Sequence, residues 1–77
     1  MQVALGLLSS DILKSIALST SDLAILERLS SHKDEFVRAN VVRNPHASEA
    51  LLEKLKKDEG REIQYQFILR RMHKKPL

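Results

Sequence analysis

The 77-residue sequence contains no cysteine and no tryptophan, and aromatic residues make up only 4% of it. Without cysteine, the chain can form neither a disulfide nor a thiolate metal site. Its two glycines are Gly6 and Gly60, which excludes a glycine-rich loop of the kind that cradles phosphate. No apolar run reaches the roughly 20 residues that a membrane-spanning helix needs. These absences remove disulfide scaffolds, phosphate loops and membrane spans from consideration.

What is present is ordinary for a soluble folded domain, with 43% hydrophobic and 30% charged residues. A chain of this length buries roughly 60% of the surface of its unfolded state, so we expect modest stability. The apolar segment 1–8 has no basic stretch before it and ends at Ser9, which argues against a cleaved signal peptide. We therefore expect a single cytoplasmic domain.

The formal net charge of +3 is unevenly distributed along the chain. Residues 1–27 carry one lysine against three carboxylates, a net charge of −2, whereas residues 28–77 carry twelve cations against seven carboxylates, a net charge of +5. Part of that excess lies at Arg70 and Arg71 and in the basic tail 73–77. Such a cationic end can attract an anionic partner.

Polar cap and turn residues divide the chain into short segments that each have the apolar spacing of a helix. Beyond a first helix within residues 1–8, the next helix is expected to be capped by Ser9, Ser10 or Asp11, and another follows the cap and turn residues 19–22. The later helices are expected to begin at Asp34 or Glu35, at Ala47 or Ser48, and after the turn 58–60. Proline cannot donate a backbone N–H, and the residue before it avoids helical angles, so Asn44-Pro45 ends one of these helices. The sequence predicts five or six short helices and no strand.

Apolar residues three or four positions apart predict the buried face of each helix. The residues expected to face inward are Ile12, Ile16, Leu26, Leu29, Val37, Val41, Leu51, Leu52, Leu55, Ile63, Phe67 and Ile68, followed by Leu13, Ala17, Phe36, Val42, Tyr65 and Met72.

The chain is similar to itself when Leu26-Glu27-Arg28-Leu29 is placed over Leu52-Glu53-Lys54-Leu55. The same shift aligns Val37 with Ile63, and in the first unit Ile12 aligns with Val37. We call this correspondence the repeat alignment. It indicates units of roughly 25 residues, at about 1–20, 21–45 and 46–72, followed by the tail 73–77. Stacked helix pairs of this kind bury a shared core that no single pair can form.

The segment from Asp34 to Pro45, Asp-Glu-Phe-Val-Arg-Ala-Asn-Val-Val-Arg-Asn-Pro, is followed by Ala50-Leu51-Leu52-Glu53-Lys54-Leu55. Together they resemble the leucine-rich repeat variant family, one of the HEAT-like α-solenoids. The resemblance implies an all-α, right-handed solenoid of about three two-helix repeats, and protein binding as its usual role. Ser19-Thr20 replaces the Asn-Pro turn in the first unit, and Gln64 replaces the arginine in the third.

No residue constellation in the sequence predicts catalysis, a cofactor or a metal site. The histidines His32, His46 and His73 have no partner at helical spacing, so we interpret them as surface residues. The adjacent carboxylates Asp34-Glu35 and Asp58-Glu59 precede helices, where negative charge is favourable. We interpret both pairs as helix caps and the protein as a non-enzyme.

Arg38 has two interpretations. As a structural residue it would form an ion pair with an acidic neighbour such as Asp34, four positions away. As a functional residue it would lie on a binding face. The ion pair is the interpretation that the spacing favours.

We expect a small non-catalytic protein-interaction or regulatory module, because both ends of the repeat array are apolar and could dock a partner protein or a second copy. The expected partner-binding residues are Arg38, Arg43, Tyr65, Arg70, Arg71 and Met72. The alternative is nucleic-acid binding through the basic C-terminal face, which a steep salt dependence would reveal. Interleaved glutamates and the scarcity of aromatic residues argue against this alternative.

Overall fold

The computed structural model describes residues 8–74, and every regular element in this range is a helix. The five helices are α1 (Ser10–Ser19), α2 (Leu23–Leu29), α3 (Glu35–Arg43), α4 (Glu49–Lys56) and α5 (Arg61–Lys74). The predicted all-α class is therefore confirmed. Residues 1–7, which hold most of the first expected helix, and the end of the basic tail, residues 75–77, lie outside the described residues.

The helices begin at polar residues that satisfy their first N–H groups. The side chain of the residue before α1, α2, α3 and α4 accepts a hydrogen bond from the first turn in each case; these caps are Ser9, Asp22, Asp34 and Ser48. At the other end, α3 stops at Arg43, and Asn44 leaves the helical region with an extended backbone just before Pro45. The predicted helix boundaries are thus confirmed to within a residue or two.

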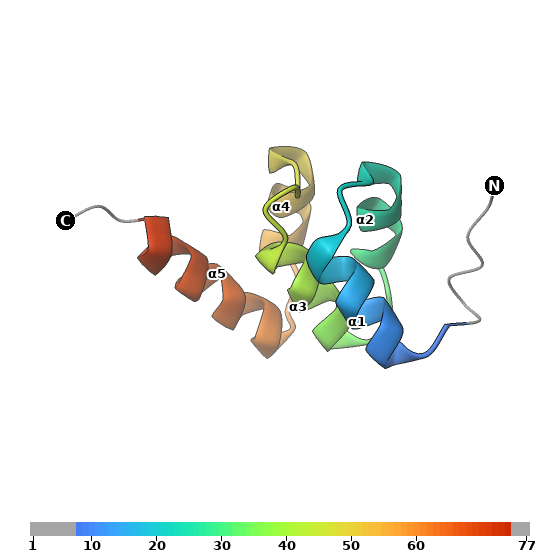
Figure 1. Ribbon diagram of the computed structural model, residues 1–77. Helices are drawn as coiled ribbons and strands as arrows, with labels where there is room; N and C mark the ends of the chain where they lie inside the picture. The colour runs from blue at the N-terminus through green and yellow to red at the C-terminus, as the bar shows by residue number, and fades with distance from the viewer. Residues whose placement is uncertain (1–7, 75–77) are drawn as a thin grey trace.

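The helices lie in two rows, which Figure 1 shows. In one row α3 packs between α1 and α5, and these packings are the most extensive in the fold. In the other row α2 and α4 lie beside each other, each connecting two successive helices of the first row. The helices of the two rows therefore alternate along the chain, and α3 is the centre of the molecule.

The core lies between the two rows. Its fully buried side chains are apolar residues of all five helices: Leu13, Ala17, Leu26, Leu29, Val37, Ala39, Val41, Val42, Leu51, Leu55 and Ile63. Most of the predicted core is confirmed by this set. Leu52, Phe67 and Ile16 are only partly buried at its edge.

Two inward-facing predictions are wrong in the first half of the chain. Ile12 is 48% exposed, because α1 turns Leu13 and Ala17 into the core instead. Phe36 is 52% exposed and lies in the first turn of α3, where the Lys14 ammonium sits 5.3 Å from the centre of its ring. A cation over an aromatic face is favourable, so the ring covers a lysine and not the core.

Three further inward-facing predictions are wrong in α5. Tyr65, Ile68 and Met72 are 52%, 57% and 66% exposed, whereas Ile63 on the opposite face is fully buried. The physical reason is that α5 packs against α3 and α4 on one side only. Within residues 8–74 no helix follows to cover its other side.

Buried amides connect the helices of the first row. The Asn44 side chain is fully buried, and its Nδ2 donates to the carbonyl oxygens of Ala17 (2.9 Å) and Thr20 (2.8 Å). Asn40 Nδ2 donates in the same way to the Lys14 carbonyl, at 2.9 Å. The last carbonyls of a helix have no partner within the helix, so Asn44, the residue after α3, satisfies carbonyls at the end of α1, and Asn40 of α3 adds a bond to the middle of α1.

Candidate functional site

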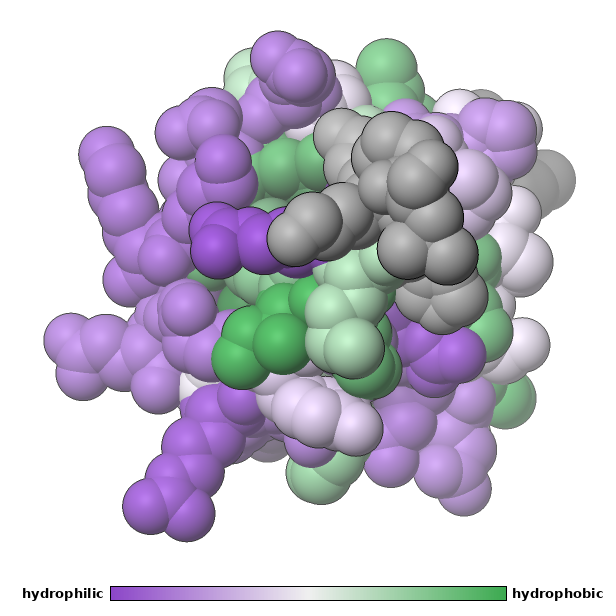
Figure 2. Space-filling view, turned by 90° about the vertical axis from the view of Figure 1, so that its left-hand side faces the viewer, coloured by the Kyte–Doolittle hydropathy of each residue, from purple (hydrophilic) through white to green (hydrophobic). Residues whose placement is uncertain are grey.

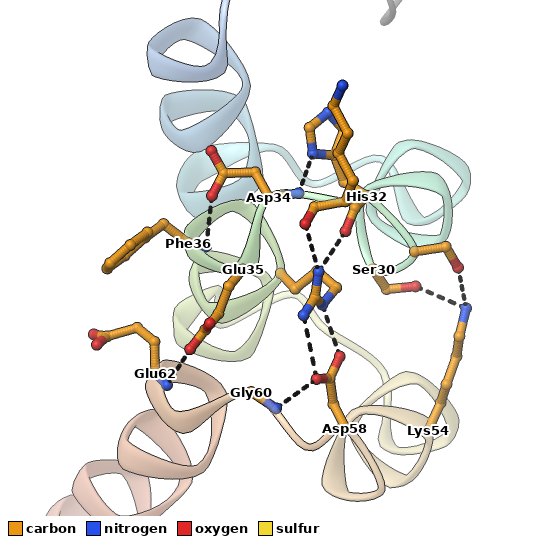
Figure 3. A network of polar contacts seen from close by, with 12 residues as sticks. Ser30, His32, Asp34, Glu35, Phe36, Lys54, Asp58, Gly60 and Glu62 are labelled. Atoms are coloured by element: carbon orange, nitrogen blue, oxygen red, sulfur yellow. Dashed lines mark hydrogen bonds and ion pairs between the residues drawn. The ribbon is translucent and has the colours of Figure 1, made fainter.

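Arg38 holds together the two loops that precede α3 and α5 (Figure 3). Its Nε donates to Asp58 Oδ2 at 2.7 Å, and its Nη1 donates to the His32 carbonyl at 2.7 Å. Both ion-pair side chains are only 19% exposed. The predicted partner Asp34 is wrong, because the Asp34 carboxylate accepts from the Phe36 N–H as the cap of α3. Arg38 therefore bonds to a residue of the next unit.

The Asp58 carboxylate is held in its ionised form. Partial burial raises its pKa, but the hydrogen bond from Arg38, the hydrogen bond from the Gly60 N–H and the positive charge of Arg38 outweigh the burial, so the pKa is lowered. The Gly60 N–H donates to Asp58 Oδ1 at 2.9 Å. With its oxygens occupied by a guanidinium and a backbone amide, Asp58 acts as a structural residue and not as an acid or base.

Two further contacts join elements that are distant in the sequence. Lys54 Nζ on α4 donates to Ser30 Oγ (2.9 Å) and Ser31 Oγ (2.8 Å) at the end of α2, as Figure 3 shows for Ser30. Glu35 Oε2 accepts from the Glu62 N–H at the start of α5, at 2.6 Å. A carboxylate at a helix N-terminus is stabilised by the unpaired N–H groups there. These contacts fix α4 on α2 and α5 on α3.

The third unit partly reproduces the contacts of the second at positions matched by the repeat alignment. Gln64 aligns with Arg38, and its Nε2 donates to the Asp58 carbonyl at 2.7 Å, just as Arg38 donates to the aligned His32 carbonyl. Arg70 aligns with Asn44, and its Nη1 donates to the Val42 carbonyl at 2.9 Å. The replacement of arginine by Gln64 therefore preserves the bond to the loop and removes the ion pair.

An open groove lies between α4 and α5. Its volume is about 440 Å³. The residues that line it combine two apolar side chains with charged and polar ones: Glu49, Leu52, Glu53, Lys56, Gln64, Phe67, Arg70 and Arg71. Leu52 and Phe67 are partly buried and continuous with the core, so the groove is an uncovered edge of that core.

Beside this groove, α5 exposes Tyr65, Ile68 and Met72. Figure 2 looks onto the end of the molecule toward which α5 projects and shows an apolar patch framed by hydrophilic side chains. We call the groove and these three residues together the C-terminal end surface. Contiguous exposed apolar groups with a polar rim are typical of interaction sites.

The charges at the groove are mixed. Lys56 Nζ forms an ion pair with Glu53 at 2.9 Å, and the hydrogen bond from Lys56 lowers the pKa of the exposed Glu53 carboxyl. Arg71 is exposed, whereas Arg70 reaches back to α3. The groove therefore has an apolar floor, two carboxylates and a lysine on its α4 side, and two arginines on its α5 side.

The structure brings together four of the six predicted binding residues. Tyr65, Arg70, Arg71 and Met72 all belong to the C-terminal end surface. Arg43 lies beside Arg70 on a second recess of about 480 Å³, which Val42, Gln66 and Leu69 also line. Arg38 lies apart from them, between the loops before α3 and α5, with its donors occupied.

Sequence reasoning missed the groove residues Leu52, Phe67 and Lys56 as binding candidates, because Leu52 and Phe67 have the spacing of core residues. The repeat alignment identifies the residue with which the exposure of Leu52 can be compared. Leu52 aligns with Leu26, which is fully buried, whereas no helix after α5 lies in the described part of the chain to cover Leu52.

The described residues give no support to other kinds of site. The part of the chain that the structure describes contains no cluster of three or more histidine, cysteine or acidic side chains that could hold a metal ion. His32 Nδ1 accepts from the Asp34 N–H at 3.0 Å, and His46 is exposed. Among the described helices, none is long and apolar enough to cross a membrane.

Comparisons of the sequence with protein-family models and with curated proteins, and of the structure with solved structures, gave no match. The inference about function therefore rests on the geometry of this molecule.

Proposed function

We propose that this chain is a small non-catalytic protein-interaction or regulatory module that binds another protein through its C-terminal end surface. The observation that carries the proposal is the open groove between α4 and α5, where Leu52 and Phe67 extend the core to the surface. Burying apolar area of this kind releases roughly 25 cal/mol per Å². A partner that covered the groove would therefore complete a core that the described residues leave open.

The shape of the groove indicates what fits it. On the inner side of the molecule, α4 packs against α3 and α5, and its Lys54 bonds to Ser30 at the end of α2. The groove on the outer side is made from the aligned surfaces of α4 and α5, so a helix of similar size and apolar spacing is the element that fits. Docking of an amphipathic helix in an apolar groove is a common mode of protein recognition.

We also propose the finer description of the fold: three HEAT-like units that stack as a right-handed α-solenoid and that resemble the leucine-rich repeat variant. The two rows of alternating helices support this description. So does the recurrence of loop bonds at aligned positions, from Arg38 to Gln64. A cytoplasmic location is part of the same proposal.

The proposal that the module is non-catalytic is supported by what the acidic residues do. Asp34 caps α3, and the hydrogen bond from the Phe36 N–H is the main reason that its pKa is lowered. Asp58 is bound by Arg38. These surroundings stabilise the ionised form of both carboxyl groups, which is the opposite of what a general acid needs.

Nucleic-acid binding remains the second candidate, because Lys56, Arg70 and Arg71 lie at one groove. The same groove also carries Glu49 and Glu53, which would repel phosphate. Lys56 is already paired with Glu53. The mixture of charges favours a protein partner over a polyanion.

The test uses a synthetic peptide with the α4 sequence, residues 48–57, as a probe for the groove. A side-chain crosslink between its first and fifth helical positions holds it helical, because a free helix of this length is marginal in water. We expect binding to shift the backbone amide resonances of Leu52 and Phe67 in a titration followed by nuclear magnetic resonance. Leu52→Lys should weaken the binding by on the order of tenfold or more, since it places a charge on the apolar floor.

Leu23→Lys is the matched control. Leu23 is 52% exposed at the start of α2 and does not line the groove, so its substitution should leave peptide binding unchanged. Shifts spread over the whole molecule, or equal effects of the two substitutions, would contradict a groove site. Titration with a labelled duplex at two salt concentrations tests the second candidate, because phosphate binding weakens steeply with salt.

A further inference from the structure

We propose that the partner at the C-terminal end surface is a second copy of this chain, which docks head to tail. In this arrangement α1 of the second copy packs against the exposed side of α5, and the apolar residues that precede α1 enter the groove between α4 and α5. The inference rests on the proposed function and names its partner.

The molecule already contains two examples of the proposed contact. In the first row, α3 packs on α1, and α5 packs on α3. In both cases the later helix donates side-chain hydrogen bonds to the earlier one: Asn44 to the Ala17 carbonyl and Arg70 to the Val42 carbonyl. The outward side of α5 thus lies where a further helix of the row would pack.

The exposed side of α5 carries apolar residues at the positions where the aligned residues of α3 are buried. In the repeat alignment, Tyr65 matches Ala39 and Ile68 matches Val42. Ala39 and Val42 are 2% and 0% exposed, whereas Tyr65 and Ile68 are 52% and 57% exposed. The position that α5 covers on α3 therefore recurs on α5 as an apolar surface with no cover in the described part of the chain.

The opposite end of the molecule offers the matching face. The residues of α3 that approach α1 include Asn40 and Asn44, and the α1 residues at the aligned positions are Ser15 and Ser19, both exposed. On the same helix Ile12 aligns with Val37, yet Ile12 is 48% exposed and Val37 is fully buried. An apolar residue flanked by small serines suits close packing against another helix.

The chain before α1 supplies an occupant for the groove. The loop before α1 is four residues shorter than the loop before α3, because Leu8 matches Leu29 while Ile12 matches Val37. With this shorter loop, Val3-Ala4-Leu5 and Leu8 align with Ala24-Ile25-Leu26 and Leu29 in α2, and with the corresponding residues of α4. At the position of Lys54 this segment has Leu7, so it brings no cation against the lysines of α4. Six residues can span roughly 20 Å when extended, which exceeds the roughly 12 Å length of a helix as short as α4. The segment can therefore reach along the groove.

The charge of the two ends is complementary. Residues 8–22, which include α1, carry one lysine against two aspartates, a net charge of −1, whereas α5 carries four cations against one glutamate, a net charge of +3. Opposite net charges steer the two ends toward each other and disfavour contact between like ends. This asymmetry favours a head-to-tail contact over a symmetric one between two C-terminal ends.

A head-to-tail contact uses two different surfaces of the same chain, so it leaves one free surface at each end of every complex. Such contacts do not close into a dimer and instead extend as chain is added. We therefore expect the mean mass of the full chain to rise continuously with concentration.

The experiment measures the mass by sedimentation velocity from low micromolar to millimolar concentration. Two substitutions block one end each: Ile12→Glu at α1 and Ile68→Glu at α5. Both residues are about half exposed, so both variants should fold, which circular dichroism checks. Each variant alone should associate at least tenfold more weakly than the original chain. Leu52→Glu blocks the groove independently and should act like Ile68→Glu.

Mixing the two blocked variants is the decisive step. Each retains the end that the other has lost, so an equimolar mixture should form a 1:1 dimer that does not grow further with concentration. If Ile68→Glu abolishes association, Ile12→Glu does not, and mixing restores nothing, the contact is symmetric and the proposal is overturned.

A second outcome separates this inference from the proposed function. If the original chain stays monomeric to millimolar concentration but the α4 peptide still binds its groove, the second copy is the wrong partner and protein binding stands. If the chain is monomeric and the peptide also fails to bind, both proposals fall.

Discussion

Residues at aligned positions of α2 and α4, and of α3 and α5, differ in how deeply they are buried. We call the side of the molecule that carries Leu26 and Val42 the inner side, and the side that carries Leu52 and Ile68 the outer side. On the inner side, Leu26 of α2 and Val42 of α3 are fully buried. On the outer side, the aligned Leu52 of α4 is partly buried, and the aligned Ile68 of α5 is 57% exposed. The difference arises because α5 packs extensively on α3, the helix that carries Val42, whereas no described helix follows α5 to cover Ile68.

This comparison teaches that the apolar pattern of a helix specifies a surface and leaves its cover to the neighbouring helices. An apolar residue that no described helix covers is therefore available for an interface, even though its spacing is that of a core residue. Substitutions at aligned positions can separate the two roles.

The largest expected effect comes from truncating the covered leucine. Leu26→Ala removes a fully buried side chain and leaves a cavity between the rows, which should lower the free energy of unfolding by roughly 2–5 kcal/mol. Leu52→Ala at the aligned outer position should cost about 1 kcal/mol, because the side chain is already at the edge. Chemical denaturation monitored by circular dichroism measures both.

Domains of this size have a total stability of roughly 4–11 kcal/mol at the usual value per residue, so Leu26→Ala could unfold the chain. Leu26→Val, which removes less volume, keeps the comparison measurable. Equal losses of unfolding free energy for the matched substitutions at Leu26 and Leu52 would show that the side chain of Leu52 is covered in solution.

The second prediction concerns the buried amide between α1 and α3. Asn44→Ala leaves the carbonyls of Ala17 and Thr20 without their donor in a buried site. The cost of unpaired buried polar groups predicts a loss of about 1–3 kcal/mol of unfolding free energy. Arg70→Ala, the aligned change on the outer side, should cost less, because its single bond to the Val42 carbonyl is only part-buried. Thermal and urea unfolding of the two variants would contradict this ranking if Arg70→Ala were the more damaging.

The third prediction uses pH to break the bond between the loops. The pKa of Asp58 is lowered in the folded state, so its ion pair with Arg38 stabilises the protein above the pKa of the unfolded chain, about 3.9. That stability is lost as the pH falls through the folded-state pKa. Asp58→Asn should therefore cost roughly 1–2 kcal/mol at neutral pH, and its difference from the original chain should vanish in acid.

The control for this pH dependence is Gln64, which aligns with Arg38 and donates to the Asp58 carbonyl without an ion pair. Gln64→Ala should lower the free energy of unfolding by an amount that does not change with pH. A pH-independent effect of Asp58→Asn would mean that the carboxylate acts only as a hydrogen-bond acceptor for the loop.

Local signals in the sequence predicted the helices well. The caps Ser9, Asp22, Asp34 and Ser48 each lie within the short polar stretch where the sequence placed a helix start, and Asn44 ends α3 as predicted. These features depend on a few neighbouring residues, and their hydrogen bonds are made within one turn. Which residue of each polar stretch becomes the cap was left open by the sequence.

Contacts between distant residues were not predictable in the same way. The nearest carboxylate to Arg38 in the expected helical register, Asp34, is committed to capping α3, so the guanidinium pairs with Asp58 from the next unit. The groove was missed for a related reason. Spacing marks Phe67 as a core residue, and only the placement of the helices shows that one side of α5 has no cover among residues 8–74.

The smallest expected change in unfolding free energy is that of Ile68→Ala, and this variant tests most directly whether a second copy covers the outer side of α5. Ile68→Ala removes an exposed side chain, so at low protein concentration it should change the free energy of unfolding by less than about 0.5 kcal/mol. If α5 docks a second copy, the midpoint of thermal unfolding of the original chain should rise with protein concentration, because association stabilises the folded state. Ile68→Ala should reduce this rise, whereas Phe36→Ala, at a similarly exposed residue on α3, should preserve it. A midpoint that does not depend on protein concentration in any of the three proteins would mean that no second copy of the chain covers the outer side of α5.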